Sequence, residues 1–209
     1  QAPADRYPDL PKTSGRVADG LLYRHWTEWR EQSYAHVFVA GYSDGRLSTT
    51  PTDVMLGERF DSPLVPDGGM EQIQWRPDGR FVAYTCRKFN GTAEAKSTNS
   101  DIYYYEVATG QTRNLSPDLP GYDRDPVFSP DGRYLAWTSL AKPGNEADRP
   151  RLMVLELATQ RRRELTEGWI WECNSPQWAA DSKSLYFLSS NDFTYQCYQI
   201  GLASASPMW

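Results

Sequence analysis

The chain has 209 residues, enough to bury a core of its own without disulfides or metal ions. Its 8 Trp, 13 Tyr, 15 Gly and 15 Pro favour short strands joined by tight turns over helices. A formal net charge of −5 argues against a nucleic-acid partner, because phosphate binding needs a basic face, and no uncharged apolar stretch of about 18 residues is present to span a membrane.

The first strand-like segments, 36–40 and 46–49, predict a hairpin. Between them, Gly41-Tyr42-Ser43-Asp44-Gly45 matches the nucleophile-elbow pattern G-x-S-x-G. A nucleophile elbow needs a helix after the serine, but the residues that follow here are strand-like. Both histidines, His25 and His36, also come before the serine, whereas a hydrolase of this kind needs one after it. We therefore predict a hairpin turn at this position and no catalytic serine.

A turn-and-strand motif then occurs three times, as an aromatic residue, a turn and an alternating apolar segment. The turn aspartates Asp78, Asp131 and Asp181 lie 53 and 50 positions apart. Pro-Asp-Gly in the first two copies is a β-turn sequence, since Pro presets φ, Asp caps the turn and Gly tolerates the exit geometry. The three copies span 75–84, 128–137 and 178–187.

A second motif follows the first two copies and repeats with an offset of 50, at 101–110 and 151–160. Each copy predicts two further strands joined by Ala-Thr-Gly or Ala-Thr-Gln. Both faces of the predicted strands carry large apolar side chains, so each sheet needs a neighbour on both sides. Stacked propeller blades provide such neighbours.

The sequence therefore predicts an all-β fold, a partial β-propeller of about three and a half four-stranded antiparallel blades within one domain. Residues 1–50 form the end of a preceding blade, 70–116 and 122–166 form two blades, and 174–200 form an incomplete blade. Propellers close with about four to eight blades, so we expect further blades beyond both ends of the chain.

Cysteine and histidine positions argue against a metal centre, and no cofactor is implied. His25 and His36 lie eleven residues apart without a cysteine cluster nearby. Cys86 lies in an apolar segment and is expected to be a buried free thiol, while a disulfide that uses Cys173 or Cys197 remains open. The run 161–163, three arginines followed by a glutamate, is predicted to be a solvated strand edge.

Loops between the predicted strands carry the candidate binding residues. Aromatic side chains supply apolar contact, and a carboxylate can pair with a substrate ammonium group. The alternative is that the tryptophans pack between blades and that the charged groups are solvated. The candidates are Arg24, Trp26, Glu28, Glu146, Arg149, Trp169, Trp171 and Glu172.

Over roughly Leu10 to Ile200, the chain resembles the propeller of the prolyl oligopeptidase family of serine peptidases, in its acylaminoacyl-peptidase and dipeptidyl-peptidase V branch. The Ser-Pro-Asp-Gly-Arg turn is shared with TolB-like propellers, and the other motifs are more specific. The motifs that carry the resemblance are Tyr23-Arg24-His25-Trp26, Ser97-Thr98-Asn99-Ser100, Ser100-Asp101-Ile102-Tyr103, Ala108-Thr109-Gly110, Ser129-Pro130-Asp131-Gly132-Arg133, Glu146-Ala147-Asp148-Arg149 and Thr166-Glu167-Gly168-Trp169.

The resemblance implies a propeller that caps an α/β-hydrolase domain, restricts access to short peptides and helps to bind the substrate N-terminus. The chain departs from the family in lacking the hydrolase domain, so we expect no catalysis from the chain alone. The resemblance also implies a periplasmic or secreted location. The alternative is a stand-alone TolB-like propeller that binds a protein partner.

Overall fold

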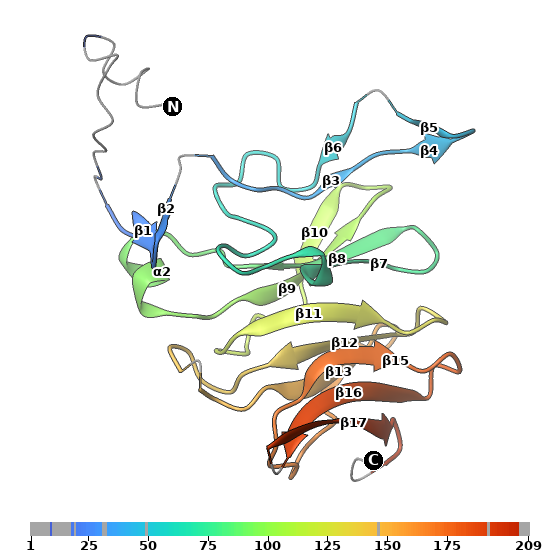
Figure 1. Ribbon diagram of the computed structural model, residues 1–209. Coiled ribbons are helices and arrows are strands. Elements are labelled where there is room, and N and C mark those ends of the chain that lie inside the picture. Colours follow the sequence, from blue (N-terminus) through green and yellow to red (C-terminus); the bar gives the residue numbers. More distant parts are fainter. Residues whose placement is uncertain are drawn as a thin grey trace.

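A computed structural model describes residues 9, 18, 20–30, 33–48, 50–145, 147–191 and 193–204. Its sheets are stacked one on another along the molecule, from the N-terminal hairpins to the C-terminal sheet (Figure 1). The predicted fold class, an all-β partial propeller, is confirmed.

Two sheets have four strands each, in the simple antiparallel order of a propeller blade. The first comprises β7 (Ile73–Trp75), β8 (Phe81–Cys86), β9 (Asp101–Glu106) and β10 (Gln111–Asn114). The second comprises β11 (Asp123–Phe128), β12 (Tyr134–Ser139), β13 (Arg151–Glu156) and β14 (Arg161–Glu164). A third sheet has three strands, β15 (Asn174–Trp178), β16 (Ser184–Asn191) and β17 (Thr194–Gly201).

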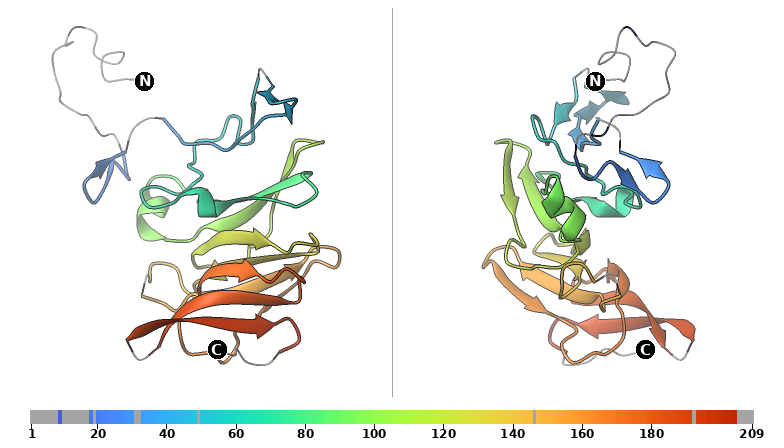
Figure 2. Two further views of the ribbon diagram at one scale, coloured as in Figure 1. Left: turned by 45° about the vertical axis from the view of Figure 1, so that its right-hand side comes forward. Right: turned by 90° about the vertical axis from the view of Figure 1, so that its left-hand side faces the viewer.

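The first strands of the three sheets, β7, β11 and β15, contact one another in succession, as strands around a common axis do. The three sheets form successive layers in both views of Figure 2. A 3-10 turn, η1 (Met70–Gln72), precedes β7, and a short helix, α2 (Thr92–Lys96), interrupts the connection from β8 to β9. The sequence pattern did not predict this helix.

The N-terminal part forms small two-stranded pairings instead of a full sheet. The expected hairpin is split: β4 (Tyr42–Ser43) pairs with β5 (Arg46–Leu47), and β3 (Phe38–Val39) pairs further along with β6 (Thr52–Asp53). Asp44 and Gly45 between β4 and β5 both have positive φ, 51° and 77°, as a two-residue type I′ hairpin turn requires. The predicted turn at the G-x-S-x-G motif is therefore correct.

The three repeated turns share one geometry. In each, the aspartate side chain accepts a hydrogen bond from the backbone N–H two residues later, at 3.1 Å for Asp78, 3.0 Å for Asp131 and 2.9 Å for Asp181. The residue directly after the aspartate is glycine in the first two turns, and both Gly79 and Gly132 have a φ of 68°. Glycine adopts this left-handed conformation without the steric cost that other residues have.

Apolar side chains from both faces of each full blade fill the spaces between sheets. Along β8, Val82 and Tyr84 face the N-terminal segment, while Ala83 faces the second blade. Along β12, Trp137 faces the first blade and Ala136 faces the third sheet. All five side chains are buried. The predicted burial of both faces is thus confirmed for the two full blades.

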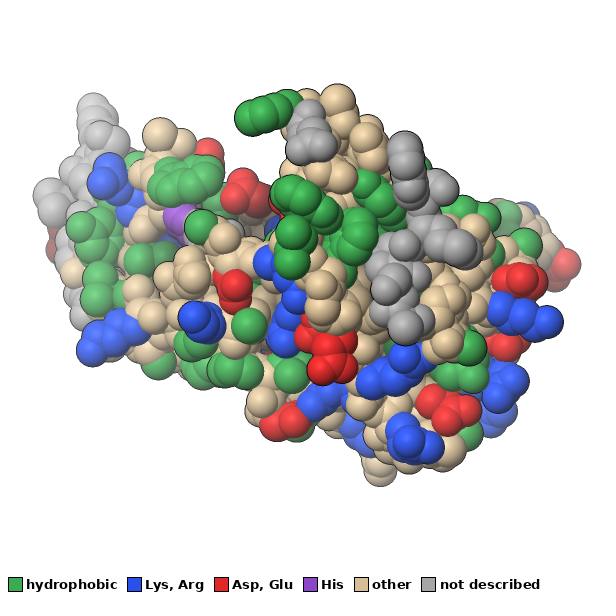
Figure 3. Space-filling model, turned by 90° about the horizontal axis from the view of Figure 1, so that it is seen from below, with side chains coloured by type: hydrophobic (Ala, Val, Ile, Leu, Met, Phe, Trp, Pro, Cys, Tyr) green, Lys and Arg blue, Asp and Glu red, His purple; other side chains and the backbone are tan. Residues whose placement is uncertain are grey.

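The third sheet buries one face and exposes the other. Burial alternates along β16, where Leu185 and Phe187 are buried and Tyr186 and Leu188 are 41% and 39% exposed. Seen from that side, hydrophobic side chains lie at several places among charged groups (Figure 3).

Polar contacts link the turns of successive blades. Arg76 Nε donates to the carbonyl oxygen of Gly132 at 3.1 Å, and Asp131 N–H donates to Ser182 Oγ at 3.0 Å. Trp178 Nε1 donates to the carbonyl oxygen of Val127 at 3.0 Å. Each blade is therefore connected to the next by hydrogen bonds as well as by apolar contact.

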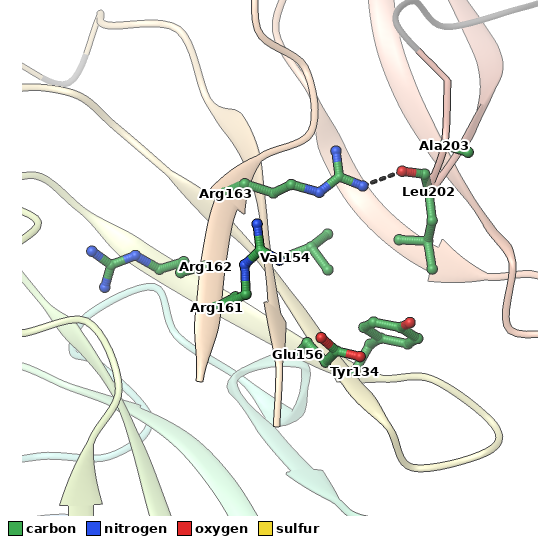
Figure 4. Close-up of a pocket in the computed structure, with 8 residues that line it drawn as sticks. All are labelled: Tyr134, Val154, Glu156, Arg161, Arg162, Arg163, Leu202 and Ala203. Carbon is green, nitrogen blue, oxygen red and sulfur yellow. Dashed lines mark hydrogen bonds between the residues drawn. The ribbon is translucent and has the colours of Figure 1, made fainter. Parts of the chain in front are cut away.

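The arginine run 161–163 differs in part from the prediction of a solvated edge. Arg162 reaches the preceding interblade connection, where it donates to the Leu115 carbonyl at 3.2 Å and pairs with Asp118 at 2.5 Å. Arg163 donates to the carbonyl oxygen of Leu202, beyond the end of β17, across a pocket of about 340 Å³ (Figure 4). Arg161 alone is exposed without such a contact among the described residues. Successive side chains alternate between the two faces of β14, so Arg162 and Arg163 reach different neighbouring segments.

The three cysteines are free thiols. Cys86 and Cys173 are buried, and burial raises the pKa of each thiol to about 12. Cys197 is exposed. The expectation for Cys86 is correct, and the disulfide left open by the sequence is not formed.

A buried carboxyl group lies where the first blade meets the second. The backbone of Asp123, at the start of β11, exchanges hydrogen bonds with Ser100, whose carbonyl accepts at 3.1 Å and whose hydroxyl donates at 2.7 Å. Burial raises the pKa of the Asp123 carboxyl from 3.8 to about 7, while Ser139 and Ser116 favour the charged form and offset part of this effect.

The side chain of Trp137 provides a test of interblade packing. It is fully buried between two sheets, so Trp137→Ala should lower the free energy of unfolding by about 3–5 kcal/mol. Urea denaturation measures this change. Tyr42→Ala is the matched control, because Tyr42 is 72% exposed and its loss should change stability by less than about 0.5 kcal/mol. Equal effects of the two substitutions would contradict the packing described.

The pH dependence of stability tests the buried carboxyl group. The folded chain holds the Asp123 proton more tightly than the unfolded chain, so this group's contribution to stability falls as the pH rises from about 4 to about 7. Asp123→Asn has no proton to lose. Its stability relative to the wild type should therefore rise over this interval and level off above it, as measured by urea denaturation in steps of pH.

Ser139→Ala is the control for this experiment, because it alters the same surroundings and keeps the titrating carboxyl group. It should retain the pH dependence that Asp123→Asn removes. A stability difference between Asp123→Asn and wild type that stays constant from about pH 4 to about pH 8 would show that the carboxyl group is not perturbed.

Candidate functional site

The antiparallel order of the blades places two kinds of loop at opposite ends of the sheets. The repeated aspartate turns lie at one end, which we call the turn end. The connections 87–100, 115–122, 140–150 and 165–173 lie at the other, which we call the connection end. The hairpin formed by β1 (Arg24–His25) and β2 (Glu28–Trp29) lies beside α2 at the connection end (Figure 1).

Arg30 holds this hairpin in place. Its guanidinium pairs with Asp61 at 2.9 Å and with Glu94 of α2 at 2.5 Å. Asp61 is itself buried and accepts a hydrogen bond from the backbone N–H of Ala35 at 2.8 Å. One arginine therefore ties the hairpin to α2 and to the segment before the first blade.

A cavity of about 580 Å³ lies between the hairpin and the connection end, within the size range of small-ligand sites. Its lining comes from segments far apart in the sequence, because blade stacking brings their connections together. These are Leu22, Arg24, His25 and Trp26; Val65, Pro66 and Asp67; Arg87 and Glu94 to Thr98; Tyr122, Arg124, Leu140, Gly144 and Pro150.

A second cavity of about 350 Å³ shares His25, Val65 and Pro66 with the first, so the two adjoin at the hairpin. Glu28 and Arg30 are among its other lining residues. The hairpin therefore forms a wall common to both cavities.

Three predicted site residues lie on this wall. Arg24 and Trp26 line the larger cavity, and Glu28 lines the smaller one. Trp26 is 71% exposed, and its ring meets that of His25 edge-on at 5.6 Å between centroids. These side chains are available to a ligand, and their role in binding stays a prediction.

Four other predicted residues lie on later connections and line neither of these cavities, namely Arg149, Trp169, Trp171 and Glu172. Arg149 pairs with Glu164 at 3.0 Å. The Trp169 ring packs edge-on against Tyr198 and Phe187, with centroids 5.0 and 6.3 Å apart, which agrees with the alternative of tryptophans packed between blades.

Trp171 and Glu172 are half-buried beside the buried Cys173. Glu146 lies outside the described residues. The role of all these residues in binding stays a prediction, and the structure does not bring Trp171 or Glu172 into one cavity with the hairpin residues.

Sequence reasoning missed a group of basic and aromatic residues in the larger cavity. Arg87 follows β8, while Tyr122 and Arg124 lie at the start of the next blade. The two guanidinium carbons lie 5.7 and 5.2 Å from the centre of the Tyr122 ring, within cation–π range. Burial raises the pKa of Tyr122, which keeps its phenol neutral. Arg87 is far from Tyr122 and Arg124 in the sequence, so no local pattern revealed this group.

Among the described residues, no group of His, Cys, Asp and Glu is arranged to hold a metal ion. Within the same part of the chain, no helix has the length and apolar character needed to cross a membrane.

No protein-family model matches the chain. Dipeptidyl-peptidase 5 of Porphyromonas gingivalis is 43% identical over 198 residues, which cover 95% of this chain. The same alignment covers 29% of the relative, so the chain spans less than a third of the length of that protein.

Two solved structures agree with the fold. A puromycin-hydrolyzing peptidase of Mycobacterium tuberculosis superposes with a TM-score of 0.54 and 20% identity, over 92% of this chain and 29% of that one. A putative TolB of Agrobacterium tumefaciens superposes with a TM-score of 0.52 and 13% identity, over 82% of this chain and 59% of that one. At these identities the likeness concerns the fold alone. Taken with the identity to dipeptidyl-peptidase 5, the blades show that the chain belongs to the dipeptidyl-peptidase branch of the prolyl oligopeptidase family, as part of the propeller.

Proposed function

We propose that the chain is the non-catalytic propeller portion of a serine exopeptidase, which gates the access of short peptides and helps to position them for an α/β-hydrolase domain. The observation that carries this proposal is the cavity of about 580 Å³ at the connection end, combined with identity to dipeptidyl-peptidase 5 over 95% of the chain. A cavity of this size suits a short peptide and excludes a folded protein.

In this proposal the hairpin wall provides the peptide contacts. Trp26 supplies an exposed apolar face, Glu28 supplies a carboxylate for a peptide ammonium group, and Arg24 supplies hydrogen-bond donors for peptide carbonyl oxygens. Arg149 and Trp169 have partners within the fold, so they support the shape of the connection end instead. Trp171 and Glu172, on the connection 165–173, are assigned to peptide contact as an aromatic side chain and a carboxylate. Glu146 is assigned to the face toward the hydrolase domain on the family resemblance alone.

Ser43 takes no part in this function. It is exposed in a strand of a tight hairpin, and the residues directly after it form β5 instead of the helix that would stabilise an oxyanion. Both histidines precede it in the chain, and His36 is paired with Asp53 at 2.9 Å. The nucleophile, acid and base of the peptidase are therefore assigned to the hydrolase domain.

A stand-alone propeller that binds a protein partner is the alternative. Its support is the fold likeness to the putative TolB, at 13% identity. The 43% identity to dipeptidyl-peptidase 5 favours the peptidase, since a fold alone does not determine function.

The coding sequence after Trp209 distinguishes the two. For the peptidase, we expect further blades and then a strand–turn–helix with G-x-S-x-G, followed by Asp and His. A reading frame that ends once the propeller closes would overturn the proposal in favour of the partner-binding propeller.

Kinetics of the full-length protein test the role of the hairpin wall. Trp26→Ala should raise KM for a chromogenic dipeptidyl substrate about fivefold and leave kcat unchanged, because it removes about 1 kcal/mol of aromatic contact. Tyr42→Ala is the matched control, since Tyr42 is 72% exposed, Trp26 is 71% exposed, and Tyr42 lies on the hairpin toward the turn end (Figure 1). If both variants have the wild-type KM, the hairpin does not hold the peptide.

A further inference from the structure

The larger cavity contains two arginines whose guanidiniums both contact one tyrosine ring. Arg87 and Arg124 come from consecutive blades, and each guanidinium contacts the ring of Tyr122, at 5.7 and 5.2 Å from its centre. All three residues line the cavity and are half-buried. The tyrosine thus fixes two positive charges at one place in the wall.

Arg87 has no carboxylate partner among the described residues. Its Nε is buried and makes no hydrogen bond, and one terminal nitrogen donates to the carbonyl oxygen of Thr98 at a long 3.4 Å. A buried donor without an acceptor is unfavourable, because the hydration of that group is lost and not replaced. The unfilled donor capacity of Arg87 therefore points to an acceptor that the described residues do not supply.

Arg124 is also weakly paired. Its closest carboxylate belongs to the adjacent Asp125, 3.6 Å from Nε, which is longer than a hydrogen bond. By contrast, Arg30 at the base of the hairpin binds two carboxylates at 2.9 and 2.5 Å. The structure thus neutralises its anchoring arginine and leaves the two cavity arginines available.

The charge of the cavity agrees with this difference. Among the described residues that line it, four side chains are cationic, those of Arg24, Arg87, Lys96 and Arg124, against two carboxylates. One of these carboxylates, Glu94, is already bound by Arg30. A positive cavity in a chain of net charge −5 selects for an anionic group.

We propose that Arg87 and Arg124 form a carboxylate-binding subsite for short peptides, with Tyr122 holding both guanidiniums in position. The planar guanidinium donates two parallel hydrogen bonds to a carboxylate, and this pairing is stronger than one between neutral groups. The subsite rests on the proposed function, since it specifies which peptides the same cavity holds. The carboxylate belongs either to the peptide C-terminus or to an acidic side chain.

Calorimetric titration of the full-length protein with three tripeptides tests the subsite, with the nucleophile of the hydrolase domain replaced so that no peptide is cleaved. The peptides are trialanine, trialanine amide, and an amidated tripeptide with one glutamate side chain. We expect trialanine to bind about tenfold more tightly than its amide, because amidation removes the carboxylate. Binding of the amidated glutamate peptide as tightly as trialanine assigns the subsite to carboxylates of either source, and weaker binding assigns it to the C-terminus.

Arg87→Gln should reduce the affinity for trialanine about tenfold and leave the affinity for trialanine amide unchanged. Arg46→Gln is the matched control, because Arg46 is an exposed arginine on β5, toward the turn end. It should bind all three peptides as the wild type does. Arg124→Gln provides a second variant, with the same expected pattern, in case Arg87→Gln unfolds, and circular dichroism monitors the fold of each variant.

The outcomes separate this subsite from the proposed function. Equal affinity of the wild type for trialanine and its amide, or full affinity of both folded arginine variants, would overturn the subsite and leave peptide binding in place. Absence of binding for all three peptides would overturn the peptide-positioning role of the cavity, and the subsite with it.

Discussion

Face-to-face packing of successive sheets is the constraint on which the rest of the structure depends. Each full blade buries side chains on both faces, so no blade has a core of its own, and each core belongs to a pair of neighbours. Trp137 and Tyr104 share one such core although they come from different blades. The positions of all loops at the connection end follow from this stacking. The cavity is therefore a product of the interblade packing as much as of the residues that line it.

This dependence explains what the sequence could and could not predict. The repeated turns were predictable because Pro-Asp-Gly and the alternating strands after it are local signals, and Asp78 and Asp131 make the same hydrogen bonds. The contacts of Arg162 were not predictable, because its partners at Leu115 and Asp118 belong to the preceding interblade connection. The helix α2 has only five residues and gives too short a pattern to recognise.

In the candidate site too, residues with a local sequence signal were predicted, and residues that meet through long-range packing were not. Arg24, Trp26 and Glu28 were found because three aromatic residues and several charges crowd a short segment. Arg87 and Tyr122 were missed because they lie 35 positions apart, and only the packing of one blade on the next brings them together. For Trp169, composition left two interpretations open, and its contacts with Tyr198 and Phe187 place it between blades. Residues that are brought together only by the stacking of blades can be recognised only from the structure.

The turn of the third sheet shows how one blade is fitted to the next. The position held by glycine in the first two turns is held by Ser182, which keeps a positive φ of 60° although serine disfavours it. Its hydroxyl accepts the backbone N–H of Asp131 in the blade before it. A glycine there would relieve the strain and lose this bond, so the third turn is adapted to its neighbour and not to the repeat. The third sheet is therefore fitted to the second blade in particular, and exchanging two blades within the propeller would break a contact of this kind.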